Sequence, residues 1–241
     1  MSFASKQLPT PCITYPTQPT LPHDVAAMHE RLSQKTKEPQ AELATALIQT
    51  AAAELIDTFF ADLLNKLVAA DETEHSYREA RAVVRDINEK LTHYLGWASS
   101  FFSNDRIRPA VAHYHSMLYM LPEADGLRGH IAFSCSSDLA QRIDAMLPAL
   151  HNGQAENAHD AIEALIEVID AAMHALLITP KKLMKFNFVV DKTLSGVISL
   201  TQTVAFRSLR KLAPHVPAEH QPILAAHLQR VVSLEAVAQV A

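Results

Sequence analysis

Cysteine and glycine are both scarce in this chain of 241 residues. The two cysteines, Cys12 and Cys135, are too few for a disulfide framework or a thiolate metal site. Only five glycines and 6% aromatic residues are present, whereas Ala, Leu, Gln and Glu recur throughout. Because these four residue types have good helix propensities, the composition favours helices over sheets.

The chain also lacks an excess of positive charge and a long apolar run. Its formal net charge is −5 and its isoelectric point is about 6.2, so a nucleic-acid partner is not expected. No uncharged apolar run approaches the roughly 20 residues that span a bilayer, which predicts no transmembrane segment. The Pro-rich sequence after residues 1–5 has no apolar signal region, and a cytoplasmic location is expected.

Prolines are concentrated near the N-terminus, where they exclude a helix. Residues 1–22 are predicted to form an extended or disordered arm, and residues 23–241 a single helical-bundle domain. The arm could be a disordered tail, or it could lie along a groove through its apolar side chains. The prolines of the arm are Pro9, Pro11, Pro16, Pro19 and Pro22.

Apolar residues after His23 recur at spacings of three and four, the pattern of amphipathic helices. We therefore predict an all-α fold, an antiparallel bundle of about six to eight helices with long C-terminal helices. The expected helices cover residues 23–35, 39–70, 73–102, 105–121, 138–151, 154–178, 181–213 and 218–237.

Charge is distributed unevenly between two consecutive helices. An acidic stripe follows one side of the first of them, formed by Glu156, Asp160, Glu163, Glu167 and Asp170. The next helix, 181–213, contains one acidic residue and seven basic ones: Lys181, Lys182, Lys185, Lys192, Arg207, Arg210 and Lys211. Both could be solvated faces with weak ion pairs. Alternatively, the basic helix contacts an acidic protein, a phosphate-bearing ligand or, peripherally, a membrane surface.

Candidates for a ligand pocket are few. Glu54 lies in an apolar stretch, and aromatic or imidazole groups occur at His93, Tyr94, Trp97 and Tyr114. These residues could line a pocket for a flat or apolar ligand, or they could be ordinary packing residues. The sequence shows no motif for a metal, a cofactor or a catalytic nucleophile, and none of the three is predicted.

Small residues line one side of the basic helix at Ser195, Gly196, Ser199 and Thr203. Because glycine inside a helix costs roughly 1 kcal/mol relative to alanine, we expect another helix to approach closely here. That helix could come from this chain or from a second copy in a homodimer.

These features favour a non-enzymatic interaction protein that presents charged helix faces to a protein partner or to a second copy. The alternative is a helical bundle that encloses a small apolar ligand or a cofactor, with or without catalysis.

Overall fold

The computed structural model of the chain describes residues 7–124, 126–154 and 158–234. The fold is predominantly helical, and its α-helices are α1 (Leu21–Ser33), α2 (Ala41–Ile56), α3 (Asp62–Ala70), α4 (His75–Ser99), α5 (Asn104–Ser116), α6 (Ser137–His151), α7 (His159–Met173), α8 (Thr179–Leu183), α9 (Phe188–Leu212) and α10 (Gln221–Val231). Four strands accompany them: β1 (Cys12–Pro16), β2 (Leu118–Glu123), β3 (Gly126–Ser134) and β4 (Val232–Ser233).

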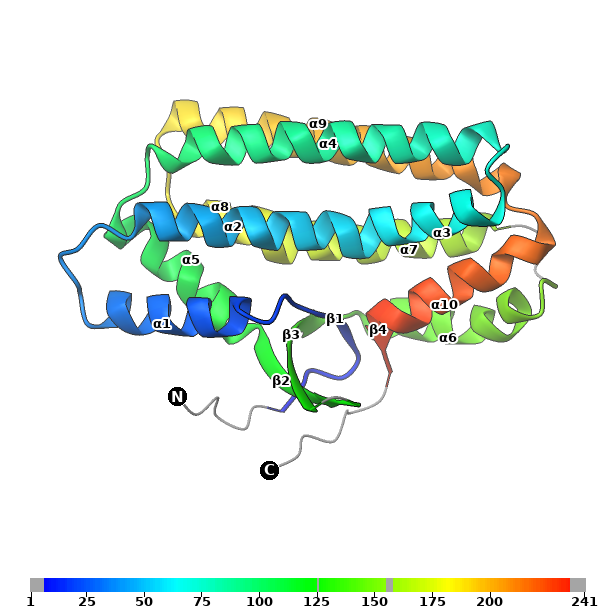
Figure 1. Cartoon of the computed structure of the whole chain (residues 1–241), viewed down its shortest axis with the longest axis horizontal. Coiled ribbons are helices and arrows are strands. Elements are labelled where there is room, and N and C mark those ends of the chain that lie inside the picture. Colours follow the sequence, from blue (N-terminus) through cyan, green and yellow to red (C-terminus); the bar gives the residue numbers. More distant parts are fainter. Residues whose placement is uncertain (1–6, 125, 155–157, 235–241) are drawn as a thin grey trace.

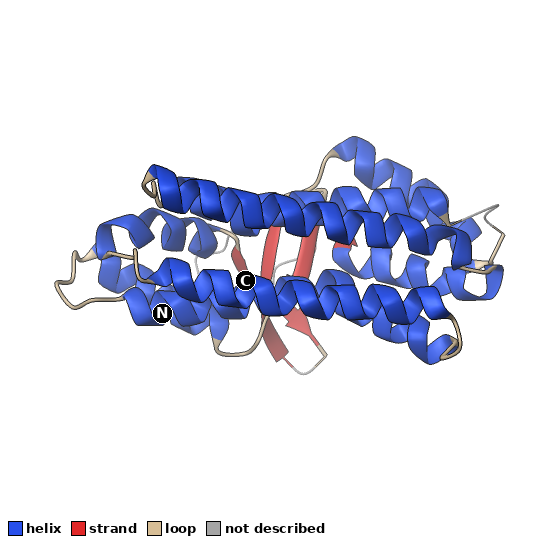
Figure 2. Cartoon of the chain, turned by 90° about the horizontal axis from the view of Figure 1, so that it is seen from above, coloured by secondary structure: helices blue, strands red, loops and turns tan. Residues whose placement is uncertain are grey.

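The elements form three layers in an elongated molecule. Figure 1 shows α4 and α9 as an outer pair above a middle pair, in which α2 and α3 lie beside α7 and α8. The sheet lies below the middle pair, with α1 and α5 on one side and α6 and α10 on the other. Figure 2, seen from above, shows the helices crossing over the strands. A continuous apolar core joins all three layers.

The sheet corrects the prediction of an all-α fold. It is antiparallel, and its strand order is β2-β3-β1-β4. Residues 118–123, expected at the end of a helix and the start of an irregular segment, form β2, which is followed by β3 in a hairpin. Apolar periodicity cannot separate a short strand from a helix end, and here pairing with a distant strand decides the outcome.

Residues 12–16 of the predicted N-terminal arm form strand β1 of the sheet, and Leu21 and Pro22, which also lie within the predicted arm, begin α1. β1 pairs with β3 on one side and with β4 on the other. Ile13 and Tyr15 point into the helical core, where the Tyr15 ring meets the Phe59 ring edge-on with centroids 5.5 Å apart. Cys12 lies on the opposite face in a smaller apolar cluster with Leu8. This part of the arm is therefore a structural strand of the sheet.

Both helices of the middle layer contain a π-helical turn. Residues Asp57–Ala61 join α2 to α3, and residues His174–Ile178 join α7 to α8. Pro180 therefore lies in the first turn of α8, where its missing N–H costs little, and the helix does not break there. The break expected at Pro180 comes later, at Lys185, whose φ of 47° is left-handed. α9 begins at Phe188, capped by Asn187, and not at residue 181.

The helix Ala41–Ala70 is long and apolar enough to cross a membrane, judged by length and composition alone. Its mean hydropathy is 1.2 over the most apolar window, and 44% of that window is buried. In the fold it occupies the middle layer, between α4 and the sheet (Figure 1). The helix is therefore apolar because it packs against other layers of the fold on two sides, as a core helix does.

Candidate interaction surface

The acidic stripe of α7 is paired with neighbouring helices. Arg210 on α9 donates two hydrogen bonds to Glu163, of 2.7 and 2.9 Å, and these bonds lower the pKa of that carboxyl. Arg142 on α6 contacts Glu167 at 2.5 Å, and Gln202 donates to Asp170 at 2.8 Å. Asp160 is exposed, and Glu156 lies outside the described residues. Most of the stripe is thus satisfied within the chain, which leaves little free negative charge for a partner.

The basic residues divide into two sets. Lys181 is buried, donates to Asp191 and lies 2.9 Å from the Ser195 hydroxyl. Together with Arg210 it is committed to contacts inside the chain. The other set is exposed and, in the described part of the chain, lies beyond ion-pair distance of any carboxylate. It consists of Lys182, Lys185, Lys192, Arg207 and Lys211.

The small-residue side of α9 faces outward. A Cβ built on Gly196 would meet no atom within 4 Å, and Ser199 and Thr203 are exposed. The close approach of another helix from this chain is therefore a wrong prediction; contact with a second copy stays a prediction. The physical reason is the phase of α9, which turns Leu194, Ile198 and Ala205 toward α4 and the core.

Three hollows among the described residues border the outward face of α9. The largest one, of about 980 Å³, lies between α5, α7 and the ends of β1 and β3, and Asp170, Phe206 and Arg210 form one wall. A second, of about 680 Å³, shares these three residues and continues across α9 to Arg207 and Lys211. On the opposite side, a hollow of about 150 Å³ opens between α4 and α9 and is also lined by Arg207 and Lys211. The predicted interaction residues Asp170, Arg207, Arg210 and Lys211 thus lie on one surface between these hollows.

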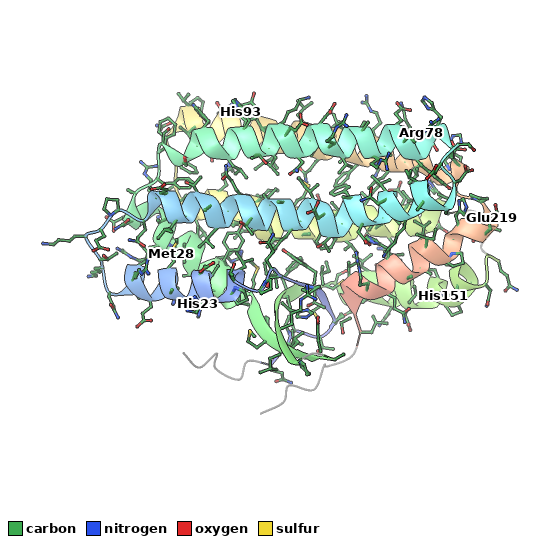
Figure 3. All side chains as sticks on the ribbon, viewed as in Figure 1. His23, Met28, Arg78, His93, His151 and Glu219 are labelled. Carbon is green, nitrogen blue, oxygen red and sulfur yellow. The ribbon has the colours of Figure 1, made fainter. Side chains whose placement is uncertain are left out.

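The five pocket candidates are not brought together. Glu54 is buried near the sheet and accepts a hydrogen bond of 2.7 Å from the Gln18 N–H. Figure 3 places His93 on the outer side of the α4/α9 layer, and Trp97 is exposed at the end of α4. Tyr94 and Tyr114 line the same internal space, but it measures only about 30 Å³. That volume suits a water molecule rather than a ligand, which needs roughly 300 Å³ or more.

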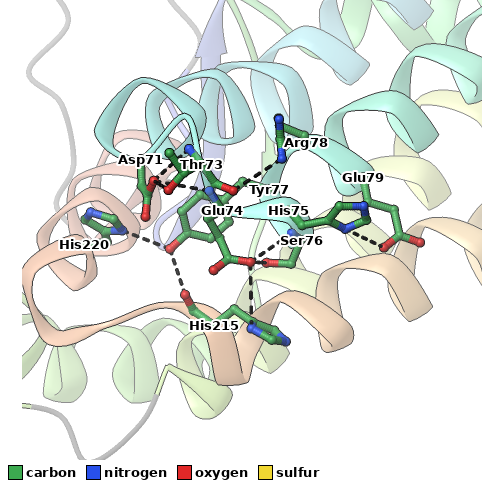
Figure 4. Close-up of polar contacts among 10 residues, drawn as sticks. All are labelled: Asp71, Thr73, Glu74, His75, Ser76, Tyr77, Arg78, Glu79, His215 and His220. Carbon is green, nitrogen blue, oxygen red and sulfur yellow. Dashed lines mark hydrogen bonds and ion pairs between the residues drawn. The ribbon is translucent and has the colours of Figure 1, made fainter.

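A polar cluster at the N-terminal end of α4 was not predicted from the sequence. Figure 4 shows Tyr77 between His215 and His220, with its hydroxyl 3.0 Å from the His215 carbonyl oxygen and 2.9 Å from Nδ1 of His220. Asp71 and Glu74 accept the backbone N–H groups of the turn into α4. Because Tyr77 and His220 are 143 residues apart, nothing local in the sequence signals their contact. The cluster fastens the start of α4 to the segment before α10.

Among the described residues, no three His, Cys, Asp or Glu side chains are grouped as metal ligands. The geometry instead offers an outward helix face with apolar and basic side chains, bordered by hollows. Compared with protein-family models, with curated proteins and with solved structures, the chain gives no match in any of the three.

Proposed function

We propose that the chain is a non-enzymatic interaction protein that binds a protein partner through the outward face of α9. The observation that supports this most is the C-terminal half of that helix. There Leu200, 61% exposed, and the exposed Val204 form an apolar crest beside Arg207 and Lys211. Exposed apolar side chains bordered by charge and by hollows are typical of protein-binding surfaces.

The charge of this face specifies the kind of partner. Arg207 and Lys211 have no carboxylate within ion-pair distance among the described residues, and one acidic residue, Glu79 of α4, lines the hollow that they share. The two basic groups therefore outnumber the acidic one at this hollow. A partner with acidic side chains around an apolar residue would complement it. The hollow of about 150 Å³ between α4 and α9 has room for one apolar anchor side chain.

The same charge disfavours a second copy of this chain as the partner. Two α9 faces placed against each other would bring basic rows together, and like charges across an interface oppose association. The acidic stripe of a second copy offers little compensation, because Glu163 and Glu167 are already paired with Arg210 and Arg142. The partner is therefore a different protein.

The internal spaces argue against the alternative of a ligand enclosed in the bundle. The two internal spaces lined by core residues measure about 20 and 30 Å³. Both are lined almost wholly by apolar side chains, and neither reaches the size of a ligand site.

A photo-crosslinking amino acid at position 200 tests the proposal in the cells that express the chain. We expect one discrete crosslinked product whose partner, once identified and purified, binds the chain in titration. Arg207→Glu with Lys211→Glu should abolish both the product and the binding, because it reverses the charge of the face. The matched control is position 127, where Leu127 is equally exposed on the β2–β3 hairpin.

Identical products from positions 200 and 127, or binding that ignores the charge reversal, would show that α9 is not the docking face. A crosslinked product composed of two copies of this chain would replace a foreign partner with self-association.

A further inference from the structure

The end of α4 and the start of α9 lie at the same end of the molecule (Figure 1), and both carry exposed apolar side chains. Phe188 is 74% exposed and Val189 67% exposed. Trp97 on α4 and Phe101 in the turn after it are also exposed, and their rings meet edge-on with centroids 5.3 Å apart. The two helix ends are held together beneath by the buried Ala98. We call the four exposed side chains the apolar pole.

Basic side chains accompany the apolar pole on the segment that leads into α9 and on its first turns. Lys182 and Lys185 are exposed in the segment that leads into α9. The Lys192 ammonium lies 5.2 Å from the centroid of the Phe188 ring, so it extends over the pole. Arg106 donates a hydrogen bond of 3.0 Å to the Lys185 carbonyl oxygen and adds a further positive charge.

Two acidic residues near the start of α9 are already paired. Asp191 accepts a hydrogen bond from Lys181, and Asp105 pairs with Arg108 at 2.9 Å. The positive charge around the pole is therefore in excess. This excess is complementary to an anionic surface.

The shape of the pole distinguishes it from the face proposed to bind a protein. None of the five hollows described in the molecule is lined by Trp97, Phe101, Phe188 or Val189. The four exposed side chains thus point away from the small internal space that Ala98, Phe186 and Leu194 line beneath them. A projecting set of aromatic and aliphatic side chains among lysines suits the boundary between lipid headgroups and acyl chains.

We propose that the apolar pole docks the protein on an anionic lipid bilayer. Phe188, Val189 and Trp97 enter the headgroup boundary, and Lys182, Lys185 and Lys192 contact the anionic headgroups. The inference is independent of the proposed protein partner, because it uses the start of α9 and not its C-terminal half.

Trp97 provides a direct readout, because it is the only tryptophan in the chain. The full chain is mixed with vesicles of phosphatidylcholine, with and without phosphatidylserine. With phosphatidylserine we expect a blue shift of the Trp97 emission, quenching by brominated lipids and co-sedimentation of the protein. Each of these effects should weaken as salt is added, since salt screens the attraction.

Two variants test the apolar and the basic parts separately. Phe188→Ser with Val189→Ser should abolish co-sedimentation while the circular dichroism stays unchanged, because both side chains are exposed. Lys182→Gln with Lys192→Gln should lower partitioning roughly thirtyfold at low salt, since each lysine near an anionic surface contributes about fivefold. The matched control is Leu200→Ser, which removes an equally exposed residue of α9 away from the pole.

Three results would overturn the inference: an unchanged Trp97 spectrum with phosphatidylserine vesicles, equal binding to both vesicle types, or partitioning that survives both variants. If Phe188→Ser with Val189→Ser leaves vesicle binding intact but removes the crosslink at position 200, the pole serves the protein partner instead.

Discussion

Glu54 is a buried carboxyl in the apolar part of the core, held against the segment between β1 and α1. One oxygen accepts the Gln18 N–H, and the other is buried without a hydrogen-bond partner among the described residues. The hydroxyl of Tyr15 is likewise buried without a hydrogen-bond partner among the described residues. Burial, which the Asp57 charge reinforces, raises the pKa of Glu54 to about 7. The native state therefore holds this carboxyl largely neutral below pH 7, and its ionisation above pH 7 costs stability.

Glu54→Gln should therefore stabilise the protein above pH 7. Because the native pKa lies above the unfolded value, the native state holds its proton while the unfolded chain releases it. Stability is then highest below about pH 4.5 and falls as the pH rises to about 7. We expect a gain on the order of 3 kcal/mol at pH 8 and almost none at pH 4.5, from urea unfolding at both values.

Glu42→Gln is the matched control, since Glu42 is an exposed carboxyl on the same helix, α2. It should change stability little at either pH. A loss of stability at pH 8 in Glu54→Gln would show that the native state needs the Glu54 charge.

The π-helical turns of the middle layer depend on side chains from other elements. A π turn disturbs the regular hydrogen bonding of a helix, and its carbonyl groups need other donors. In the turn before α8, His113 donates to the Ala175 carbonyl oxygen at 2.8 Å and Tyr114 donates to that of Leu176. In the turn before α3, Arg230 donates to the Thr58 carbonyl oxygen at 3.1 Å. The two turns are thus fixed by α5 and α10.

Tyr114→Phe should destabilise the protein by about 1–3 kcal/mol, because it leaves the buried Leu176 carbonyl group without its donor. Hydrogen exchange of the amides at residues 174–178 should increase as well. Tyr94→Phe is the matched control, since Tyr94 is only half buried on α4. Equal stability of the two variants would contradict a structural role for the Tyr114 hydroxyl.

At the scale of the whole molecule, strand β1 pairs the N-terminal part of the described chain with its C-terminal part. β1 lies between the β2–β3 hairpin and β4, so it connects the N-terminal segment with residues after α10. Ile13 is fully buried, and its partners across the sheet are Phe133 and Val232. Removing β1 would leave β4 without its partner strand and would expose the core residues that Ile13 and Tyr15 cover.

Deleting residues 1–16 should therefore abolish cooperative thermal unfolding. A milder version is Ile13→Ala, which should cost about 2–5 kcal/mol through the cavity it creates. Thr10→Ala, at an exposed position six residues before the end of β1, should change stability little. A shortened chain that melts cooperatively at the original temperature would show that the arm is dispensable, as the proline pattern by itself suggests.

The sequence by itself determined most of the helices, because apolar periodicity and capping residues act within a few turns of the chain. It did not determine the break at Lys185 or the strands β2 and β4, which replace the ends of predicted helices. The long helices, the stop of α6 at Gly153 and the outward phase of Lys192, Arg207 and Lys211 all follow from local spacing. The acidic stripe was also visible in the sequence, since it depends on spacings of three and four.

Only the tertiary structure decided which partners these elements meet. Strand β1 exists because Ile13 and Tyr15 pair with residues more than 100 positions away, and no local pattern separates such a strand from an extended arm. The pairing of Glu163 with Arg210 and the empty space beside Gly196 likewise depend on how α7, α4 and α9 pack. Contacts of this kind join segments far apart in the sequence, so they form only when the whole chain packs together, and no local pattern predicts them.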